Sequence, residues 1–183
     1  MKKYVVLLRG INVGGKNKIA MSELKRCLEE HGCKEVMTYI QSGNVMLSSD
    51  KDVQTLGSEI ETLLTDNFKL DSSLIKVLVL TEAQLSGIIA NKPKGFGEQP
   101  EKYHSDVIFL MGIDGASAMS VFKPREGVDQ IWPGNGVIYS QRLSEMRTKS
   151  RLNRIMGTPQ YQSMTIRNWN TTLKLHTLLM SPT

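Results

Sequence analysis

The sequence predicts an α+β protein of two ferredoxin-like halves, each an α/β plait with helices on one face of an antiparallel sheet. Strand-like and helix-like patterns follow the order β-α-β-β-α-β over the first 80 residues, which is the order of a split β-α-β unit. Residues 6–12 (VLLRGIN) resemble residues 108–114 (IFLMGID), and residues 43–48 (GNVMLS) resemble residues 134–140 (GNGVIYS). Two echoes in the same order indicate internal duplication.

The same patterns predict the domain boundaries. Residues 1–80 form the first plait with a glycine loop, residues 81–102 a helix and linker, and residues 103–183 the second plait with basic C-terminal helices. Within the middle segment, residues 91–100 (NKPKGFGEQP) are rich in helix breakers and charges. We therefore expect a linker or a long surface loop there.

The first half begins with a strand that is buried on both faces, because residues 4–9 are almost continuously apolar. Met21, Leu24 and Leu28 then recur at helical spacing, and Gly32 stands where that helix ends. The rest of this half consists of two strands around a turn, a helix and a last strand: residues 35–40, 45–48, 53–63 and 74–80.

The second half begins after a capping box of Thr81 and Gln84, which starts a helix. Asp114 is the expected N-cap of a short helix that ends at Phe122. Residues 147–156 and 168–180 also carry helical patterns. The expected strands are apolar runs bounded by turn residues: residues 106–111, 128–132, 137–141 and 163–166.

The topology of the first half brings two polar turns together. Because crossovers are right-handed, its third strand lies between the first and the second and is antiparallel to both. The first and second strands then run in the same direction. We therefore expect the loop of residues 10–18 and the turn of residues 41–44 to emerge at the same edge of the sheet.

The segment 10–17 (GINVGGKN) is one residue away from the phosphate-binding loop G-x-x-x-x-G-K-[ST]. Asn17 replaces the hydroxyl residue that holds magnesium, and the hairpins predict an antiparallel sheet rather than the parallel sheet of that motif. The sequence thus argues against nucleotide hydrolysis. A metal-free anion site is still compatible with this edge, and its expected ligand-binding residues are Arg9, Asn12, Gly14, Gly15, Lys16, Lys18, Gln41, Ser42 and Asn44.

A purely structural interpretation competes with this anion site. In this interpretation the glycines only permit positive φ, and Asn12 and Asn44 bond their own turns. The sequence leaves both interpretations open.

Positive charge is concentrated near the C-terminus. Residues 140–183 hold seven basic residues and one acidic residue, although the whole chain carries a net charge of only +5. Arg147, Arg151 and Arg154 lie on one stripe if residues 147–156 are α-helical, a candidate contact for a nucleic-acid backbone. On that helix Leu152, Ile155 and Met156 turn inward. The alternative is a solvated face with no partner.

The sequence predicts a cytoplasmic protein without a membrane partner, because the apolar run of the N-terminus stops at Arg9 and no segment is long enough to span a bilayer. Cys27 and Cys33 are expected to be reduced thiols. No metal site, cofactor or catalytic set is predicted, and the three histidines are scattered. Whether the protein is an enzyme, and its oligomeric state, are left open.

Three blocks resemble a bacterial family known as domain of unknown function 1697: residues 9–17 (RGINVGGKN), 39–45 (YIQSGNV) and 165–171 (TIRNWNT). The resemblance implies a two-part α/β plait and no particular activity. It also implies that the third block, which contains Arg167, Asn168 and Asn170, is a characteristic feature of the family. There Asn168 is expected to cap the last helix and Trp169, with Leu173, to pack it down. Alternatively, Arg167 and Asn170 face the edge of the glycine loop.

Together these patterns predict a cytoplasmic binding protein for an anionic, phosphate-bearing ligand or for nucleic acid. Two alternatives remain open: a small-molecule enzyme with a site between the two halves, and a structural or interaction protein.

Overall fold

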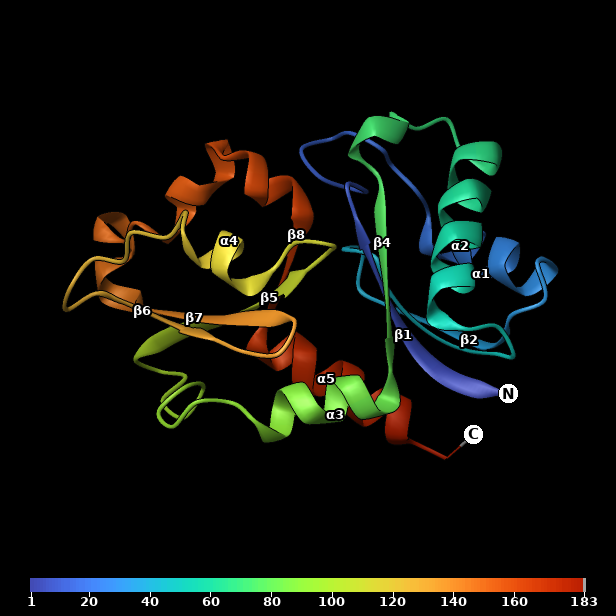
Figure 1. Ribbon diagram of the computed structural model, residues 1–183. Helices are drawn as coiled ribbons and strands as arrows, with labels where there is room; N and C mark the ends of the chain where they lie inside the picture. Colours follow the sequence, from blue (N-terminus) through green and yellow to red (C-terminus); the bar gives the residue numbers. More distant parts are fainter. Residues whose placement is uncertain (183) are drawn as a thin grey trace. The chain divides into compact units, whose positions relative to one another are not determined.

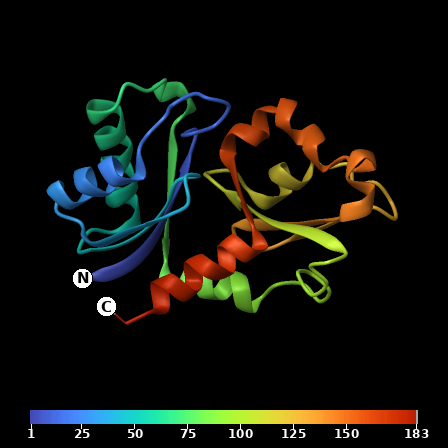
Figure 2. The same ribbon diagram turned by 180° about the vertical axis from the view of Figure 1, so that it is seen from behind.

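Two four-stranded antiparallel sheets with their helices make up the α+β structure (Figures 1 and 2), a computed structural model that describes residues 1–182. One compact unit comprises Met1–Ser86 together with the chain from Lys174 onwards, and the other comprises Gly87–Leu173. The boundaries at residues 80 and 103 stay a prediction. In the described part of the chain, no helix is long and apolar enough to cross a membrane.

The sheet of the first unit has the strand order β2-β3-β1-β4, and all its pairings are antiparallel. The third strand therefore lies between the first and the second, as the topological argument predicts. The strands are β1 (Lys2–Arg9), β2 (Lys34–Tyr39), β3 (Asn44–Ser49) and β4 (Lys76–Thr81). The whole Tyr4–Leu8 stretch of β1 is buried, so both faces of this strand are covered, as its unbroken apolar run predicts.

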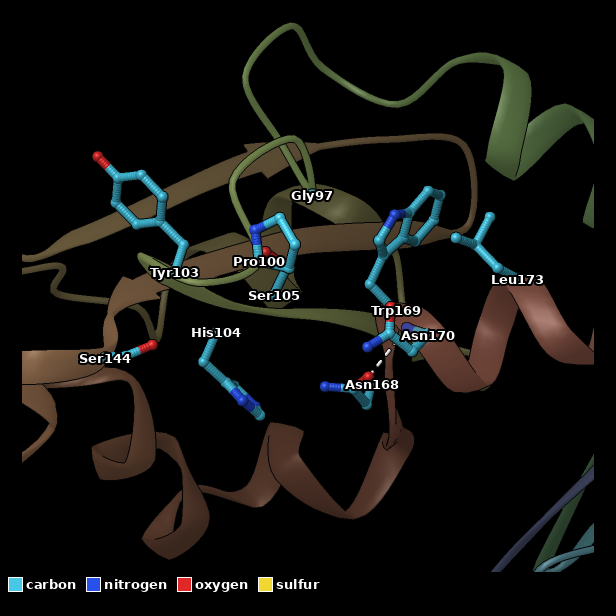
Figure 3. A pocket seen from close by; sticks show the side chains of 10 residues that line it. All are labelled: Gly97, Pro100, Tyr103, His104, Ser105, Ser144, Asn168, Trp169, Asn170 and Leu173. Carbon is cyan, nitrogen blue, oxygen red and sulfur yellow. Dashed lines mark hydrogen bonds between the residues drawn. The ribbon is translucent and has the colours of Figure 1, made fainter.

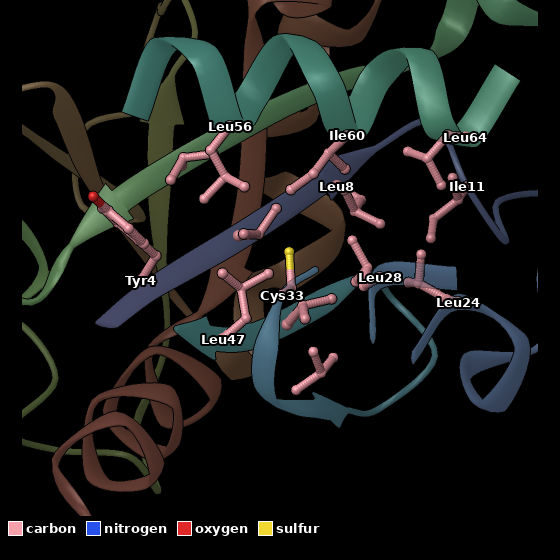
Figure 4. Close-up of a cluster of buried hydrophobic side chains, with 14 of the residues drawn as sticks. Tyr4, Leu8, Ile11, Leu24, Leu28, Cys33, Leu47, Leu56, Ile60 and Leu64 are labelled. Atoms are coloured by element: carbon pink, nitrogen blue, oxygen red, sulfur yellow. The ribbon is translucent and has the colours of Figure 1, made fainter. Parts of the chain in front are cut away.

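Helices α1 (Met21–Glu30) and α2 (Val53–Asn67) cover one face of this sheet. Leu56, Ile60 and Leu64 of α2 point down onto β1 (Figure 4), where they join alternate residues of the strand, such as Tyr4 and Leu8, in one hydrophobic core. A short 3₁₀ helix, η1 (Ser72–Leu74), precedes β4, and α3 (Glu82–Ala90) follows it.

The second sheet repeats the arrangement, with the strand order β6-β7-β5-β8. Its strands are β5 (Tyr103–Leu110), β6 (Asp129–Pro133), β7 (Val137–Leu143) and β8 (Met164–Asn168). The helical elements of this half are α4 (Gly115–Met119), the 3₁₀ helices η2 (Ser144–Lys149), η3 (Leu152–Gly157) and η4 (Pro159–Ser163), and α5 (Trp169–Met180). Residues from α4, η3 and η4 cover one face of this sheet in a second hydrophobic core.

The predicted helix starts are confirmed by side-chain hydrogen bonds. In the capping box of α3, the N–H of Gln84 donates to the Thr81 hydroxyl at 3.1 Å and the N–H of Thr81 donates to the Gln84 side chain at 2.9 Å. Asp114 accepts from the N–H of Ser117 at 2.8 Å at the start of α4. These caps satisfy backbone donors that have no partner inside the helix.

Most of residues 147–156 are helical, but they belong to two 3₁₀ helices and not to the expected single α-helix. Ser150 is extended and separates η2 from η3. At this break the N–H of Arg151 donates to the Asp129 carboxylate at 2.8 Å, and the N–H of Leu152 donates to the Ser150 hydroxyl at 3.2 Å. These side-chain acceptors replace the backbone acceptors that an α-helix would use, so the α-helix is interrupted.

Residues 91–100 form a loop, as their breakers predict, but the loop has a buried anchor. Phe96 is 0% exposed, and its ring meets those of Trp132, Tyr139 and Trp169 edge to face, with ring centroids 5.1–6.0 Å apart. Phe96 therefore anchors the loop on the second unit, and the N–H of Gly97 also donates to Oε1 of Gln141 there at 3.0 Å.

Candidate functional site

Asn12 joins the glycine loop to the turn after β2. Its side-chain amide donates to the carbonyl oxygen of Gln41 at 2.9 Å and to that of Ile19 at 3.1 Å, and its Oδ1 accepts from the N–H of Ile19 at 2.8 Å. Loop 10–18 and turn 41–44 thus lie side by side, as the strand topology predicts.

Asn17, which stands where a phosphate-binding loop would have a hydroxyl, holds the loop from the other side. Its Nδ2 donates to the carbonyl oxygen of Gly10 at 2.8 Å, and its Oδ1 accepts from the N–H of Asp71 at 2.9 Å. The tip is closed by the N–H of Lys16, which donates to the carbonyl oxygen of Val13 at 2.9 Å. The amide oxygen of Asn17 is thereby used in folding the loop.

Two of the nearby glycines are required by packing and two are not. Gly10 has φ +87°, and a Cβ added there would overlap the carbonyl oxygen of Leu74. Gly43 has φ +82°, and its added Cβ would lie 2.8 Å from the Cβ of Leu8. By contrast, Gly14 and Gly15 have positive φ but nothing within 4 Å of an added Cβ.

The expected ligand-binding residues fall into two groups. Asn12 and Asn44 bond their own turns: the buried Asn44 amide donates to the carbonyl oxygen of Tyr39 at 3.1 Å and to the hydroxyl of Ser42 at 2.9 Å. The other group comprises the half-buried Arg9 and the exposed residues Lys16, Lys18, Gln41 and Ser42. We call this second group, with the exposed peptides of Gly14 and Gly15, the basic edge.

One carboxylate lies beside the basic edge. Hydrogen bonds from the hydroxyl and the N–H of Ser73 lower the pKa of Asp71, and the charge of Lys16 lowers it further. On β1, Arg9 is paired in register with Lys76 of β4. The edge therefore carries an excess of positive charge that Asp71 offsets only in part.

Replacing Asn12 by alanine is expected to lower the free energy of unfolding by about 2 kcal/mol, because three hydrogen bonds are lost and alanine is strained at φ +51°. Asn12→Gly removes the same bonds without the strain and should cost about 1 kcal/mol less. Urea denaturation of both variants measures this difference. Equal stability of wild type and Asn12→Gly would mean that the bridge to Gln41 contributes nothing.

The candidate nucleic-acid contacts belong to the second unit. Arg147 on η2 and Arg154 on η3 are exposed, and Arg151, which precedes η3, is half-buried. The three do not form the expected α-helical stripe. Of the three residues expected to turn inward, Leu152 and Ile155 are buried, whereas Met156 is 59% exposed. Because a 3₁₀ helix repeats every three residues, Leu152 and Ile155 share a face of η3 that Met156 does not.

The third block begins in the interior of the second unit. Arg167 is buried and donates to the Thr165 hydroxyl at 2.8 Å and to the carbonyl oxygen of Ile166 at 2.9 Å, and burial lowers the pKa of its guanidinium to about 10. Asn168 caps α5, since its Oδ1 accepts from the N–H of Asn170 at 2.9 Å. Trp169 is buried, as expected, whereas Leu173 is 37% exposed.

A pocket of about 210 Å³ lies next to this block, in the second unit (Figure 3). Its residues come from the loop before β5, from the start of β5, from η2 and from α5; they include Tyr103, His104, Ser105, Ser144, Trp169 and Asn170. Sequence reasoning identified only the α5 end of this pocket, because the other segments are far apart in the chain.

His104 lies on β5 beside an acidic side chain. Its Nε2 is 3.0 Å from Oδ2 of Asp106. Burial raises the pKa of the Asp106 carboxyl, and the charges of His104 and Arg142 act in the opposite direction. The i, i+2 spacing of His104 and Asp106 on a strand was a usable signal, because it places both side chains on one face.

Comparison with known proteins identifies a family but not an activity. No curated protein matches the chain significantly. A solved structure described as that of "conserved bacterial protein SP0830 from Streptococcus pneumoniae" is similar over 97% of this chain and 98% of that chain, with 25% sequence identity and a TM-score of 0.82. The model of the family described as "Protein of unknown function (DUF1697)" matches residues 1–139, which include the first two blocks but not the third. Since this match covers more than half of the 183 residues, the chain belongs to the DUF1697 family of proteins of unknown function.

Proposed function

We propose that this protein is a cytoplasmic, non-catalytic binding protein that holds a phosphate-bearing ligand at the basic edge. The observation that carries this proposal is the bridge from Asn12 to the carbonyl oxygen of Gln41, which keeps the lysine-bearing loop beside the polar turn. Lys16 and Lys18 supply positive charge there, and Gln41 and Ser42 supply neutral hydrogen-bonding groups.

Phosphate suits this edge better than a metal-bound nucleotide does. Its oxygens accept hydrogen bonds from ammonium groups, hydroxyls and exposed peptide N–H groups, all of which the edge offers. The asparagine bonds hold the loop in place before a ligand arrives, so that binding costs less conformational entropy. At the position where a phosphate-binding loop holds magnesium with a hydroxyl, Asn17 uses its amide within the loop instead.

The test is a charge-removal variant with a matched control. Lys16→Gln combined with Lys18→Gln removes two exposed charges from the basic edge. Lys2→Gln combined with Lys34→Gln also removes two exposed charges, but from the first residues of β1 and β2, at the ends of these strands that lie away from the basic edge. Both variants have the same net charge, so a general electrostatic effect would weaken binding equally in both.

Binding would be measured with two probes, a fluorescein-labelled 12-nucleotide RNA and ribose 5-phosphate. We expect the Lys16/Lys18 variant to bind at least about tenfold more weakly than the control, and the salt dependence of RNA binding to lose about two units of slope. RNA binding alone would identify a nucleic-acid partner, and ribose 5-phosphate binding alone a phosphorylated metabolite. Equal binding by both variants, or no binding of either probe by the wild type, would overturn the proposal.

The arginines of η2 and η3 define a second part of the nucleic-acid version of this proposal. Arg147 and Arg154 are exposed, and we propose that they contact a nucleic-acid backbone together with Arg151. Loss of RNA affinity in an Arg147→Gln, Arg154→Gln variant would support this. Unchanged affinity would leave these residues as a solvated face.

We also propose that both halves are ferredoxin-like plaits that arose by internal duplication. The equivalent strand orders β2-β3-β1-β4 and β6-β7-β5-β8 support this, as do the two sequence echoes. The second half differs in having 3₁₀ helices where the first has α2.

A further inference from the structure

The pocket of the second unit exists because β5 is longer than its neighbour β8. The last paired residues of these strands are Asp106 and Asn168, so Tyr103–Ser105 extend beyond the end of β8. There the chain turns into α5, and Gly97 and Pro100 of the anchored loop close the opposite side. Figure 3 shows the space bounded by these segments.

The charges around the pocket disfavour an ionic ligand. Among its ten lining residues there is no lysine, arginine, aspartate or glutamate, and the imidazole of His104 is already paired with Asp106. A charged ligand would lose its hydration without gaining a dedicated counter-charge. An uncharged ligand that forms hydrogen bonds avoids that cost.

Two amide side chains supply the hydrogen-bonding groups. Asn168 uses its Oδ1 to cap α5, whereas its Nδ2 has no hydrogen-bond partner within residues 1–182. In Figure 3 this nitrogen lies on the side of His104. The exposed side chain of Asn170 likewise has no partner within those residues, and it offers both a donor and an acceptor. The backbone N–H of Asn170 already donates to Asn168, so this N–H at the start of α5 is not available to bind the ligand.

The remaining walls are apolar or weakly polar. Trp169, Pro100 and Leu173 contribute rings and a branched side chain. Ser105 donates its hydroxyl hydrogen to Oε1 of Gln141 at 2.7 Å, which leaves its oxygen as an acceptor only. A volume of about 210 Å³ is below that of pockets for drug-sized molecules, so the ligand is small.

We propose that this pocket binds a small, uncharged ring compound bearing a carboxamide or lactam group, in which a carbonyl oxygen and an N–H stand side by side. Asn168 donates to the carbonyl oxygen, Asn170 pairs with the N–H, and the ring lies against Trp169. This site belongs to the second unit and does not depend on phosphate binding at the basic edge.

Nicotinamide and nicotinate form the decisive pair of probes, because they have nearly the same size but differ in charge at neutral pH. ¹H–¹⁵N NMR of the full chain follows the side-chain amides of Asn168 and Asn170 and the indole N–H of Trp169. We expect nicotinamide to shift these resonances with a Kd on the order of 1 mM, as suits so small a ligand, and nicotinate to bind at least about tenfold more weakly. Uracil, a lactam, should shift the same resonances.

Variants separate this site from general surface binding. Asn170→Ala should weaken nicotinamide binding at least about fivefold through the lost hydrogen bonds, whereas Asn153→Ala, at an exposed position of η3 outside the pocket, should have no effect. Ser144→Phe fills the pocket from an exposed position and should abolish binding. Equal or tighter binding of nicotinate, unchanged binding by Asn170→Ala, or no shifts with either nicotinamide or uracil would overturn the proposal.

Discussion

Replacing Gly10 by alanine is expected to lower the free energy of unfolding by about 4 kcal/mol, the largest effect of any single change in the glycine loop. The added Cβ would overlap the carbonyl oxygen of Leu74, which is backbone and cannot move aside as a side chain could. In addition, the residue has φ +87°, where an L-residue is strained. Part of the cost is therefore the displacement of η1 from the start of β4.

Gly14→Ala is the matched control, because it has the same chemistry at φ +57° without any atom within 4 Å of the added Cβ. It should cost only about 1–2 kcal/mol from the positive φ. Urea denaturation of both variants, followed by circular dichroism, gives the two values. If Gly10→Ala proved as stable as Gly14→Ala, close packing against Leu74 would not explain the glycine.

The second large effect is expected for Phe96→Ala, which should destabilise the second unit by about 3–5 kcal/mol. Phe96 is fully buried and meets three other aromatic rings, so alanine would leave a cavity and remove all three edge-to-face contacts. Loss of this anchor should also release residues 91–100, with Gly97 and Pro100 of the pocket wall. We expect proteolysis within that loop to become faster.

Two further measurements sharpen the Phe96 result. Met156→Ala, at a 59% exposed position of the same unit, should change the free energy of unfolding by no more than about 0.5 kcal/mol. Phe96→Leu keeps much of the buried volume and should cost clearly less than Phe96→Ala. If Phe96→Ala cost no more than Met156→Ala, residues 91–100 would act as a linker and not as an anchored loop.

The elements of the fold could largely be predicted because their causes are local. The unbroken apolar run of β1 indicates a strand covered on both faces, and Tyr4–Leu8 are all buried. The caps at Thr81 and Asp114 work through bonds to residues three positions away, so a short window of sequence contains both partners. The convergence of the glycine loop with the turn after β2 followed from strand direction alone.

The use of individual side chains was decided by tertiary contacts. Asn17 bonds to Asp71, 54 positions away, which no local pattern reveals. The Asp129 carboxylate accepts a hydrogen bond from the N–H of Arg151 and so interrupts the helix expected over residues 147–156. Residues 91–100 have the composition of a linker, but the aromatic contacts of Phe96 anchor them as a loop. Hydrophobic periodicity and residue propensity are local properties of the sequence, and they carry no information about a hydrogen bond between distant segments.

By itself the sequence determined the α+β class, the order and pairing of the strands in the first half, the helix caps and the basic character of the edge near Lys16. Only the tertiary structure decided that Asn12, Asn17 and Asn44 serve the loop and its neighbouring turn, that the arginines of η2 and η3 share no α-helical stripe, and that a pocket opens beside α5. The physical reason is range: periodicity and capping act over a few residues and strand direction follows from the order of elements, whereas polar side chains form hydrogen bonds with whichever groups the fold brings near them.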